Sequence, residues 1–549
     1  MCNNNGLALP NGLIFLMRKA FVIVSGLLLG MCSAGRESQT GGEVSGWMMS
    51  EMGKGFLLSL GQEWEVFLEG VALDANEFLY LVGTTIISGE RGIDIRMIGD
   101  SLDSHTFSDS PPRDIYVAKV SPDGHLIWDR IIGGPKDEWG YSVAVDGKGG
   151  VYVVGSTSSY GAGKDDVFVV KLDTSGRYVW ARAVGGSDID FATNAMMGPD
   201  GYLYLAGTTY SFGPQKDNDF PEDLASSMYV LKLSTEGRLA WDRAIGTPWR
   251  DYAHGIAFDR EGNLIIGASS TYNFEYNPYL FERIDGPCLL KMSPEGKLHW
   301  IRWYLGVDDI VGLNTSVAVD DNDHIVLAGN VMAVFYPWTH LIRTNPMGNA
   351  IWCRQGVLLG EAGMSVGYPV AVAIDDDGTI LVAGDKLGGL SGTSYVMQVD
   401  SSDGCLIKYW HLVCNNWVRM ADMQIVPGKA IVLVGNYGGT GYVMRLEKDF
   451  ENFQACDVCS LDIGGPEKQI LRARTFFDEA GDDSAESEYN IRKRQCATRD
   501  SAMGPHFILS HVVDDPPPLP VVGIIDAKGK VTVPSPVVAV PRLSTRIYH

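Results

Sequence analysis

An all-β chain built from seven similar units is predicted by three features of this sequence. A run of apolar residues that ends in glycine recurs at a spacing of about 59 residues. These glycines are Gly83, Gly155, Gly207, Gly267, Gly329, Gly384 and Gly435. Each unit is rich in Val, Ile, Tyr and Phe, is interrupted by Asp-Gly or Ser-Gly turns, and sustains no helical period. About four strands fit in each unit, which is the size of one propeller blade, so the sequence predicts a seven-bladed β-propeller.

The second half of each unit carries a pattern of Lys, Gly, Trp and Arg, as in KVSPDGHLIWDR. Copies of this pattern begin at Lys119, Lys171, Lys232, Lys291, Arg343 and Val399, and a degenerate copy begins at Met444. The sixth copy has Lys408 where the others have tryptophan. Residues that recur once per unit usually maintain the packing between units, so we assign these tryptophans and arginines to the scaffold.

The first unit is preceded by GFLLSLGQ, which resembles the strand found in WDRIIGG and WARAVGG. The seventh unit lacks its own copy of that strand after Glu447. We therefore expect residues 56–60 to pair with residues 442–446 and to complete the last blade, which would join the two open ends of the ring. The predicted propeller spans residues 55–455.

Residues 114–159 resemble the β-propeller repeat family found in many secreted bacterial proteins, with its Asp-x-Tyr-Val-x-Lys, Gly-Gly, Ala-Val-Asp and Val-x-Gly-x-Thr motifs. The resemblance extends over residues 55–450 and implies the propeller fold, but it leaves the function open. KLDTSGRYVWAR also resembles the tryptophan-docking repeat of quinoprotein dehydrogenases. Those enzymes carry adjacent cysteines beside the quinone, and no two cysteines are adjacent here, so a quinone cofactor is not implied.

The N-terminal residues 1–34 have the pattern of a signal peptide, and the true start is expected at Met17 or at Met1. A basic pair precedes the apolar run 20–31, which is too short to span a bilayer. Two processing routes are open. Cys32 is either the lipidated residue of a lipoprotein or part of the Cys-Ser-Ala site for ordinary cleavage before Gly35. Residues 35–54 would then form a linker, and the protein would be secreted, periplasmic or attached to the cell surface.

The acidic composition of the chain disfavours some classes of binding partner. The chain has 44 Lys and Arg against 67 Asp and Glu, a formal net charge of −23. Nucleic acids and anionic membrane surfaces are disfavoured because binding to phosphate needs clustered cations. We expect a monomer with a protein or carbohydrate ligand, and membrane contact only through a lipid anchor.

Residues 456–549 differ in composition from the repeats and are predicted to form an acidic, Pro-rich C-terminal extension. A small hairpin is expected around residues 527–529. Cys456 and Cys459 form a lone CxxC, which is compatible with a redox pair or half of a zinc site, and more simply with a disulfide or two free thiols.

Three long connections, residues 88–113, 211–227 and 271–287, leave from one face of the predicted ring, because successive strands of a blade reverse direction. Binding concentrates in such loops. Eight aromatic residues of blades 4 and 5 lie in or near them: Tyr272, Phe274, Tyr276, Tyr279, Phe281, Phe335, Tyr336 and Trp338. They would stack on sugar rings or contact a protein, or else pack the insertion onto its own blade.

Carboxylates of three successive blades are predicted on the same face. Glu138, Asp190 and Asp251 stand at equivalent positions, and His254 is close in sequence. If exposed at the channel mouth, they would bind calcium or act as acid and base on a substrate. Alternatively they cap turns or pair with the repeated arginines. The next positions hold a largely aromatic series that we interpret as packing between blades: Phe67, Trp139, Phe191, Tyr252, Leu313 and Tyr368.

These features favour a binding module over an enzyme. The sequence contains no H-E-x-x-H, G-x-S-x-G or P-loop motif. The leading hypothesis is a secreted or surface-anchored propeller that presents its long-loop face to a protein or glycan. The alternative is an extracytoplasmic hydrolase or lyase that uses the carboxylates with His254.

Overall fold

The computed structural model describes residues 55–61, 65–86, 113–213, 225–273, 283–305, 310–333, 336–355, 367–386, 393–414 and 418–447, and short strands between 459 and 547. The chain divides into two compact units, Met1–Trp47 and Met48–His549, and all described residues belong to the second. The regular elements in the described part are all β-strands. Accordingly, this part contains no helix that is long and apolar enough to cross a membrane.

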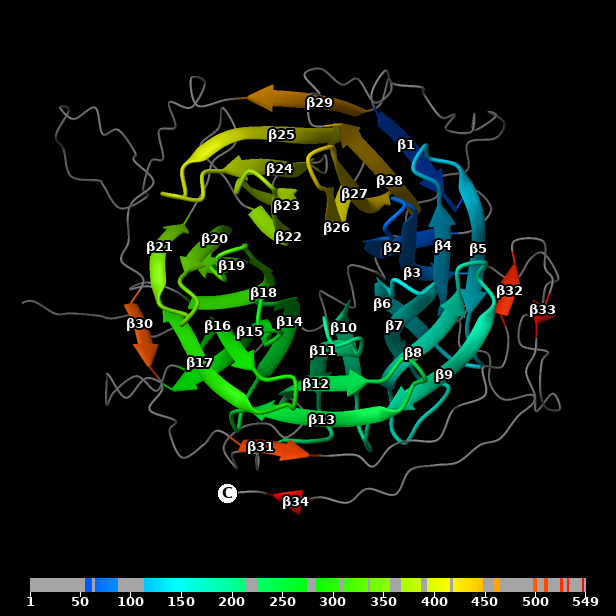
Figure 1. Cartoon of the computed structure of the whole chain (residues 1–549), viewed down its shortest axis with the longest axis horizontal. Helices are drawn as coiled ribbons and strands as arrows, with labels where there is room; N and C mark the ends of the chain where they lie inside the picture. The colour runs from blue at the N-terminus through cyan, green and yellow to red at the C-terminus, as the bar shows by residue number, and fades with distance from the viewer. Residues whose placement is uncertain are drawn as a thin grey trace, which may run out of the picture. The chain divides into compact units, whose positions relative to one another are not determined.

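Seven antiparallel sheets are arranged as blades around a common axis (Figure 1). The innermost strands of blades 1 to 7 are β2 (Glu65–Leu73), β6 (Glu138–Val145), β10 (Asp190–Met197), β14 (Asp251–Phe258), β18 (Ile310–Val319), β22 (Gly367–Ile374) and β26 (Val418–Val426). The second strands are β3 (Leu79–Ile86), β7 (Gly150–Thr157), β11 (Leu203–Thr209), β15 (Leu264–Asn273), β19 (Ile325–Ala333), β23 (Ile380–Lys386) and β27 (Ala430–Tyr437).

The two outer layers complete each blade. The third strands are β4 (Arg113–Val120), β8 (Asp166–Asp173), β12 (Ser227–Leu233), β16 (Arg283–Met292), β20 (Tyr336–Thr344), β24 (Thr393–Val399) and β28 (Thr440–Glu447). The fourth strands are β5 (Leu126–Ile132), β9 (Tyr178–Val184), β13 (Leu239–Gly246), β17 (Leu298–Leu305), β21 (Ala350–Gln355), β25 (Leu406–Cys414) and, in blade 7, β1 (Gly55–Leu60). The predicted seven-bladed all-β ring is therefore confirmed.

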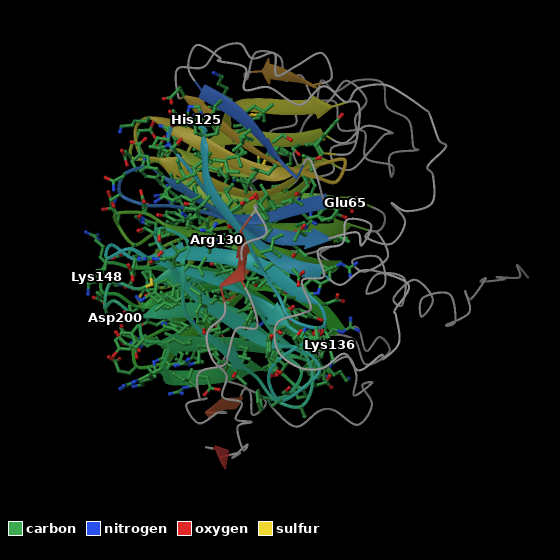
Figure 2. All side chains as sticks on the ribbon, turned by 90° about the vertical axis from the view of Figure 1, so that its right-hand side faces the viewer. Glu65, His125, Arg130, Lys136, Lys148 and Asp200 are labelled. Carbon is green, nitrogen blue, oxygen red and sulfur yellow. The ribbon has the colours of Figure 1, made fainter. Side chains whose placement is uncertain are left out.

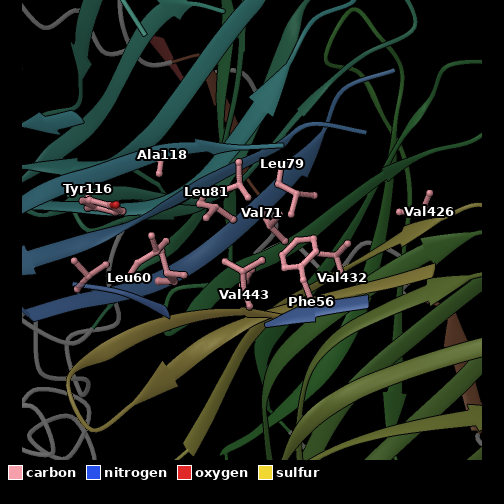
Figure 3. Close-up of a cluster of buried hydrophobic side chains, with 14 of the residues drawn as sticks. Phe56, Leu60, Val71, Leu79, Leu81, Tyr116, Ala118, Val426, Val432 and Val443 are labelled. Atoms are coloured by element: carbon pink, nitrogen blue, oxygen red, sulfur yellow. The ribbon is translucent and has the colours of Figure 1, made fainter. Parts of the chain in front are cut away.

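The N-terminal strand closes the ring as predicted. β1 pairs antiparallel with β28 from Gly55 opposite Leu446 to Leu60 opposite Gly441. Phe56 is buried in a cluster that joins blades 7 and 1, which includes Val432 and Val443 (Figure 3). The first and last strands of the ring are thus joined through both a hydrogen-bonded ladder and apolar packing.

Aromatic rings from the outer layers of six blades dock on the next blade, and blade 6 has Lys408 at the equivalent position. Trp128 of blade 1 lies against Gly176 of blade 2, which has φ of +75° and on which a Cβ would come within 2.9 Å of the indole ring. The Trp128 Nε1 donates to the Thr174 carbonyl at 3.0 Å. The same arrangement joins Trp180 to Gly237, Trp241 to Gly296, Trp300 to Gly348, Trp352 to Gly404 and, at the closure, Phe56 to Gly124. The assignment of these repeats to the scaffold is confirmed.

Polar side chains of the second strands also link neighbouring blades. Asn436 Oδ1 of blade 7 accepts a hydrogen bond from the Leu68 amide of blade 1 at 2.6 Å. Asp385 and Thr84 accept the corresponding amides of the blades that follow them. In blade 6 the pairing of β22 with β23 places Pro369 where those blades have the residue that donates this amide. Proline has no N–H to donate, and Asn330 Oδ1 of blade 5 is buried without a hydrogen-bond partner.

Strands from the C-terminal region extend four of the blades outward. β29 (Cys459–Gly464) pairs with β25, β30 (Ala497–Asp500) with β17, and β31 (Ile508–His511) with β13. β32 (Ile524–Asp526) pairs with β5 and forms the predicted hairpin with β33 (Val531–Thr532), and β34 (Arg546–Ile547) pairs with β31. These strands follow the outside of the ring rather than its centre (Figure 1).

The ring has two distinct faces. Inner strands begin on one face, near Glu65 and Lys136, and the second connections of the blades leave from that same face. We call it the insertion face. The tight turns around His125, Lys148 and Asp200 lie on the opposite face, which we call the turn face (Figure 2).

Candidate functional site

The three predicted carboxylates are completely buried, so the expectation that they are exposed is wrong. The Glu138 carboxylate accepts a hydrogen bond from the Gly134 amide at 2.6 Å and one from the Thr157 hydroxyl at 2.8 Å. The equivalent amide bonds join Gly186 to Asp190 and Thr247 to Asp251, each at 2.6 Å. Each carboxylate therefore caps the connection that enters its own blade.

The physical reason is the parity of the inner strand. The position that precedes each aromatic residue points between the blades, where burial raises the pKa of Glu138 to about 7 and that of Asp190 to about 6. In the described part of the chain, no three His, Cys, Asp or Glu side chains gather closely enough to hold a metal ion. The calcium and acid–base roles of these carboxylates stay predictions, while the turn-capping alternative has hydrogen bonds to support it.

Asp190 has an acidic neighbour that sequence spacing did not reveal. A methyl group placed on Gly185 would lie 2.1 Å from Asp166 Oδ1 and 2.7 Å from Asp190 Oδ2, so the two carboxylates face each other across this glycine. Asp166 is completely buried and accepts hydrogen bonds from the Ala162 and Gly163 amides. Burial, together with the charge of Asp190, raises the pKa of Asp166 to about 7. The pair is sealed between blades 2 and 3 and is not open to a ligand.

His254 lies on inner strand β14 and is partly exposed. Its Nε2 is 2.9 Å from the Ser269 hydroxyl, and its ring stacks on Tyr252 with centroids 6.2 Å apart. Burial lowers the pKa of His254 to about 4, so the ring is neutral at neutral pH.

Five of the predicted aromatic residues lie outside the described residues: Phe274, Tyr276, Tyr279, Phe281 and Phe335. Cys32 and Cys456 also lie outside them. For Tyr272, Tyr336 and Trp338 only the backbone is described, in strands β15 and β20. Their role in binding stays a prediction. Among the described cysteines, Cys288 is buried and Cys405 exposed, both as free thiols, whereas Cys353 is disulfide-bonded.

Inner strands carry a β-bulge in every blade. In blade 1 the register shifts between Leu68 and Gly70, which leaves Glu69 unpaired. The bulged residues are Glu69, Tyr141, Thr193, His254, Asn314, Val370 and Ala421. Those with described side chains are all partly exposed, whereas the residue before each of them is buried. A bulge re-aims one side chain, and on the innermost strands it does so around the ring axis.

The bulged residues differ from blade to blade, unlike the scaffold. Blades 1 to 4 contribute Glu69, Tyr141, Thr193 and His254, whereas blades 6 and 7 contribute Val370 and Ala421. Neighbouring members of the polar set are connected, because the charge of Glu69 acts on Tyr141 and the Thr193 hydroxyl donates to the Ala253 carbonyl at 3.3 Å. The bulged residues of blades 1 to 4 are therefore polar, and those of blades 6 and 7 are apolar.

A ring of large side chains lies closer to the insertion face, two residues before the bulges. We call these residues the axis ring; they are Phe67, Trp139, Phe191, Tyr252, Tyr368 and Arg419. The five aromatic members are partly exposed. Tyr141 contacts Phe191 with ring centroids 6.2 Å apart, and His254 stacks on Tyr252, so two bulge residues touch members of the axis ring.

Arg419 is the member of the axis ring that the sequence pattern missed. Blade 7 has no Ala-Val-Asp motif from which to count back, and its turn is Pro427-Gly428 instead. The register opposite Asn436 places Arg419 where blade 6 has Tyr368, opposite Asp385. Its side chain is 60% exposed, and one guanidinium nitrogen lies 3.6 Å from Glu69 Oε1.

Two acids set the electrostatics beside Arg419. Burial raises the pKa of Glu69, and the Arg419 charge partly offsets that rise. Burial likewise raises the pKa of Asp385 to about 6, against its hydrogen bonds with the Met420 amide and the Ser394 hydroxyl. The charges of Glu69 and then Asp385 raise the pKa of Arg419, so the guanidinium is a permanent cation at the axis.

Comparison with known proteins agrees with the repeat. Residues 127–161 match the family model described as Beta-propeller repeat. The regulatory protein FlaEY of Caulobacter vibrioides is 32% identical over 188 residues, which are 30% of this chain and 19% of FlaEY. The uncharacterized WD repeat-containing protein L264 of Acanthamoeba polyphaga mimivirus is 23% identical over 200 residues, 30% of this chain and 14% of L264. The chain thus spans less than a fifth of the length of these relatives.

Solved structures with a similar course of the chain have low sequence identity. An ulvan lyase of polysaccharide lyase family PL25, bound to a glucuronate–sulfated rhamnose unit, has a TM-score of 0.37 and 10% identity, and the match covers 59% of this chain and 91% of the lyase. A Dyadobacter fermentans protein of unknown function has a TM-score of 0.36, 10% identity and coverage of 71% and 98%. The Pseudomonas aeruginosa periplasmic gluconolactonase PpgL has a TM-score of 0.34 and 13% identity, and the match covers 64% of this chain and 94% of PpgL. The activities in these names are those of the other proteins.

Proposed function

We propose that this chain, a seven-bladed β-propeller that carries the Beta-propeller repeat, is an extracytoplasmic binding protein for carbohydrate. The ligand binds at the insertion-face end of the ring axis, where the axis ring and the polar bulge residues meet. The observation that carries this proposal is the asymmetry of the axis. Scaffold positions repeat from blade to blade, whereas the partly exposed axis positions do not, and a binding site is asymmetric by nature.

Aromatic members of the axis ring supply apolar contact. Trp139, Phe191, Tyr252 and Tyr368 are partly exposed on inner strands. Such rings offer large, rigid faces that pack against the C–H faces of sugar rings, and the Tyr hydroxyls add a hydrogen-bonding end. Inner strands of the ring hold these side chains more firmly than loops would, so binding costs little side-chain entropy.

Polar bulge residues supply hydrogen bonds beside those rings. Glu69 accepts, Tyr141 and Thr193 both donate and accept, and neutral His254 offers Nδ1, because its Nε2 is bonded to the Ser269 hydroxyl. Sugar hydroxyls need partners of both kinds when they leave water, because an unpaired polar group is costly to bury. A protein ligand would instead favour an apolar core with few charges.

Loss of binding in an axis variant tests the proposal. Wild-type protein is screened for affinity against a panel of soluble polysaccharides, and Tyr252→Ala is expected to weaken the best binder about tenfold, about 1.4 kcal/mol. The matched control is Tyr178→Ala, which removes a partly exposed tyrosine from outer strand β9.

Two results would contradict the proposal. Equal loss in both tyrosine variants means that the ligand does not bind at the axis. Absence of carbohydrate binding, with a folded protein that captures a protein ligand through the same residues, means that the ligand class is wrong.

Extracytoplasmic location is part of this proposal and rests on the sequence of residues 1–34, which lie outside the described residues. Cell fractionation of wild type and Cys32→Ala separates the two processing routes. Lipidation predicts that wild type partitions with membranes and that the variant is released with its propeller folded, because Cys32 precedes β1. A mature N-terminus at Gly35 establishes ordinary cleavage.

A second candidate function is cleavage of the bound polysaccharide, and His254 is the observation that favours it. A histidine that is neutral at neutral pH and stacked on Tyr252 can accept a proton from a substrate. Among the described residues, His254 is held by the Ser269 hydroxyl and the Tyr252 ring rather than by a carboxylate. Ultraviolet absorbance of unsaturated sugars and assays of new reducing ends, on wild type and His254→Ala, distinguish catalysis from binding.

A further inference from the structure

We propose that Arg419 makes the axis site selective for acidic carbohydrate, in which the guanidinium binds the carboxylate of a uronic acid. This inference rests on the proposed function, and it names the class of carbohydrate. Its basis is the position of Arg419 in the axis ring, the exposure of its guanidinium and the contacts that hold it.

Position singles out Arg419. Each described member of the axis ring in blades 1 to 4 and 6 is aromatic, and blade 7 alone among them places a cation there. Neighbours around the ring are Tyr368 of blade 6 and Phe67 of blade 1, so Arg419 stands between two aromatic members of the axis ring. A ligand that stacks on the aromatic members therefore brings one of its substituents to the guanidinium.

Free donors are the second observation. The Arg419 side chain is 60% exposed, and among the described residues its contact is the 3.6 Å ion pair with Glu69, which is longer than a hydrogen bond. By comparison, Arg182 donates to the carbonyls of Gly237 and Ala181 and is buried. A guanidinium offers five N–H groups in a planar fork that matches a carboxylate, so Arg419 has donors left for a ligand.

Glu69 and Asp385 oppose an anionic ligand by charge, but their geometry limits the effect. Asp385 already accepts the Met420 amide at 2.7 Å and the Ser394 hydroxyl at 2.7 Å, which directs it between blades 6 and 7. Glu69 is 26% exposed and lies on the bulge, deeper along the axis than Arg419. Glu69 of blade 1 and Asp385 of blade 6 thus flank Arg419 of blade 7, and the exposed part of its side chain is left to contact a ligand.

A comparison of two probes tests the inference on the full-length protein. Affinity gel electrophoresis and titration calorimetry measure binding to polygalacturonate, whose sugars carry carboxylates, and to laminarin, a neutral glucan. We expect tighter binding of polygalacturonate, weakened by added salt because charges pair. Arg419→Gln should weaken polygalacturonate binding at least tenfold and leave laminarin unchanged. Arg419→Lys should restore part of the affinity, since a lysine keeps the charge but lacks the planar fork.

Arg177→Gln is the matched control, because it removes one positive charge from an arginine that is 79% exposed on the turn face. Its binding of both probes should equal that of wild type. Equal binding of polygalacturonate by wild type and Arg419→Gln overturns the inference, and so does wild-type binding of laminarin alone, which would leave the proposed function intact. Binding of neither probe nor any other polysaccharide removes the proposed function itself.

Discussion

Replacing Asp166 by Asn is expected to stabilise the propeller at pH 8, although the change removes a buried, hydrogen-bonded carboxylate. Asp166 and Asp190 face each other between blades 2 and 3, and Oδ1 of each is buried without a hydrogen-bond partner. Two carboxylates buried on either side of Gly185 repel each other when both are ionised, so ionising the second one costs free energy. An asparagine retains an oxygen that can accept the Ala162 and Gly163 amides, and it adds an N–H that can donate to Asp190.

The magnitude follows from the pKa of Asp166. Raising it from 3.8 to about 7 disfavours the ionised form in the folded state by roughly 4 kcal/mol at high pH. Part of this cost is repulsion shared with Asp190, whose pKa is about 6, so we expect Asp166→Asn to gain on the order of 2 to 4 kcal/mol at pH 8. Because the pKa of Asp166 is raised on folding, this carboxyl stabilises the fold most below about pH 4, and its contribution is lost as the pH rises through about 7.

Urea unfolding at pH 5 and at pH 8 measures this effect, with the slope of the transition monitored for departure from two-state behaviour. The wild-type midpoint should fall between pH 5 and pH 8, and Asp166→Asn should flatten that fall. Asp173→Asn is the control, because hydrogen bonds with Ser175 and Arg177 outweigh desolvation and lower the pKa of Asp173 to about 2, outside this window. A variant that is less stable than wild type at both pH values would refute the reasoning and show that Asp166 is needed as an ionised cap.

Three further substitutions address the scaffold, each measured by thermal and urea unfolding. Phe56→Ala should cost about 3 to 5 kcal/mol, since a buried ring is removed at the closure, and an unchanged midpoint would mean that β1 does not hold the ring. Pro369→Ala should gain about 1 kcal/mol, because the amide offered to Asn330 outweighs the entropic advantage of proline; a net loss would contradict this. Gly176→Ala should destabilise more than Gly201→Ala, because both have positive φ but only the first methyl would meet an indole ring; equal losses would argue against tight docking.

The architecture could be predicted because it repeats. Glycines that mark the second strands, tryptophans that dock on the next blade and the orphan strand at residues 55–60 are each encoded locally, and all of them are confirmed by the strand order. The strands added by the C-terminal region could not be foreseen, because their pairing with β25, β17 and β13 joins segments without a common pattern.

The candidate site was harder to predict because it depends on departures from the repeat. A bulge inserts one residue and re-aims Glu69, which no two-residue periodicity shows. Arg419 was not predicted, because blade 7 lacks the Ala-Val-Asp motif from which the equivalent positions of the other blades were counted. Glu138 was expected at the surface, but one step along a strand exchanges an exposed position for a buried one. Contacts across blades, such as that between Asp166 and Asp190, are invisible in a linear pattern.

Pairing of β1 with β28 also constrains how the molecule is made. The first strand of the propeller to leave the ribosome must wait for the last one, because its partner is the final strand of blade 7. Until β28 is made, β1 has no strand to pair with, and the apolar side chains of Phe56 and Leu60 lack their partners from blade 7. Non-local pairing of this kind forms slowly, so we expect the ring to close only after β28 has been synthesised.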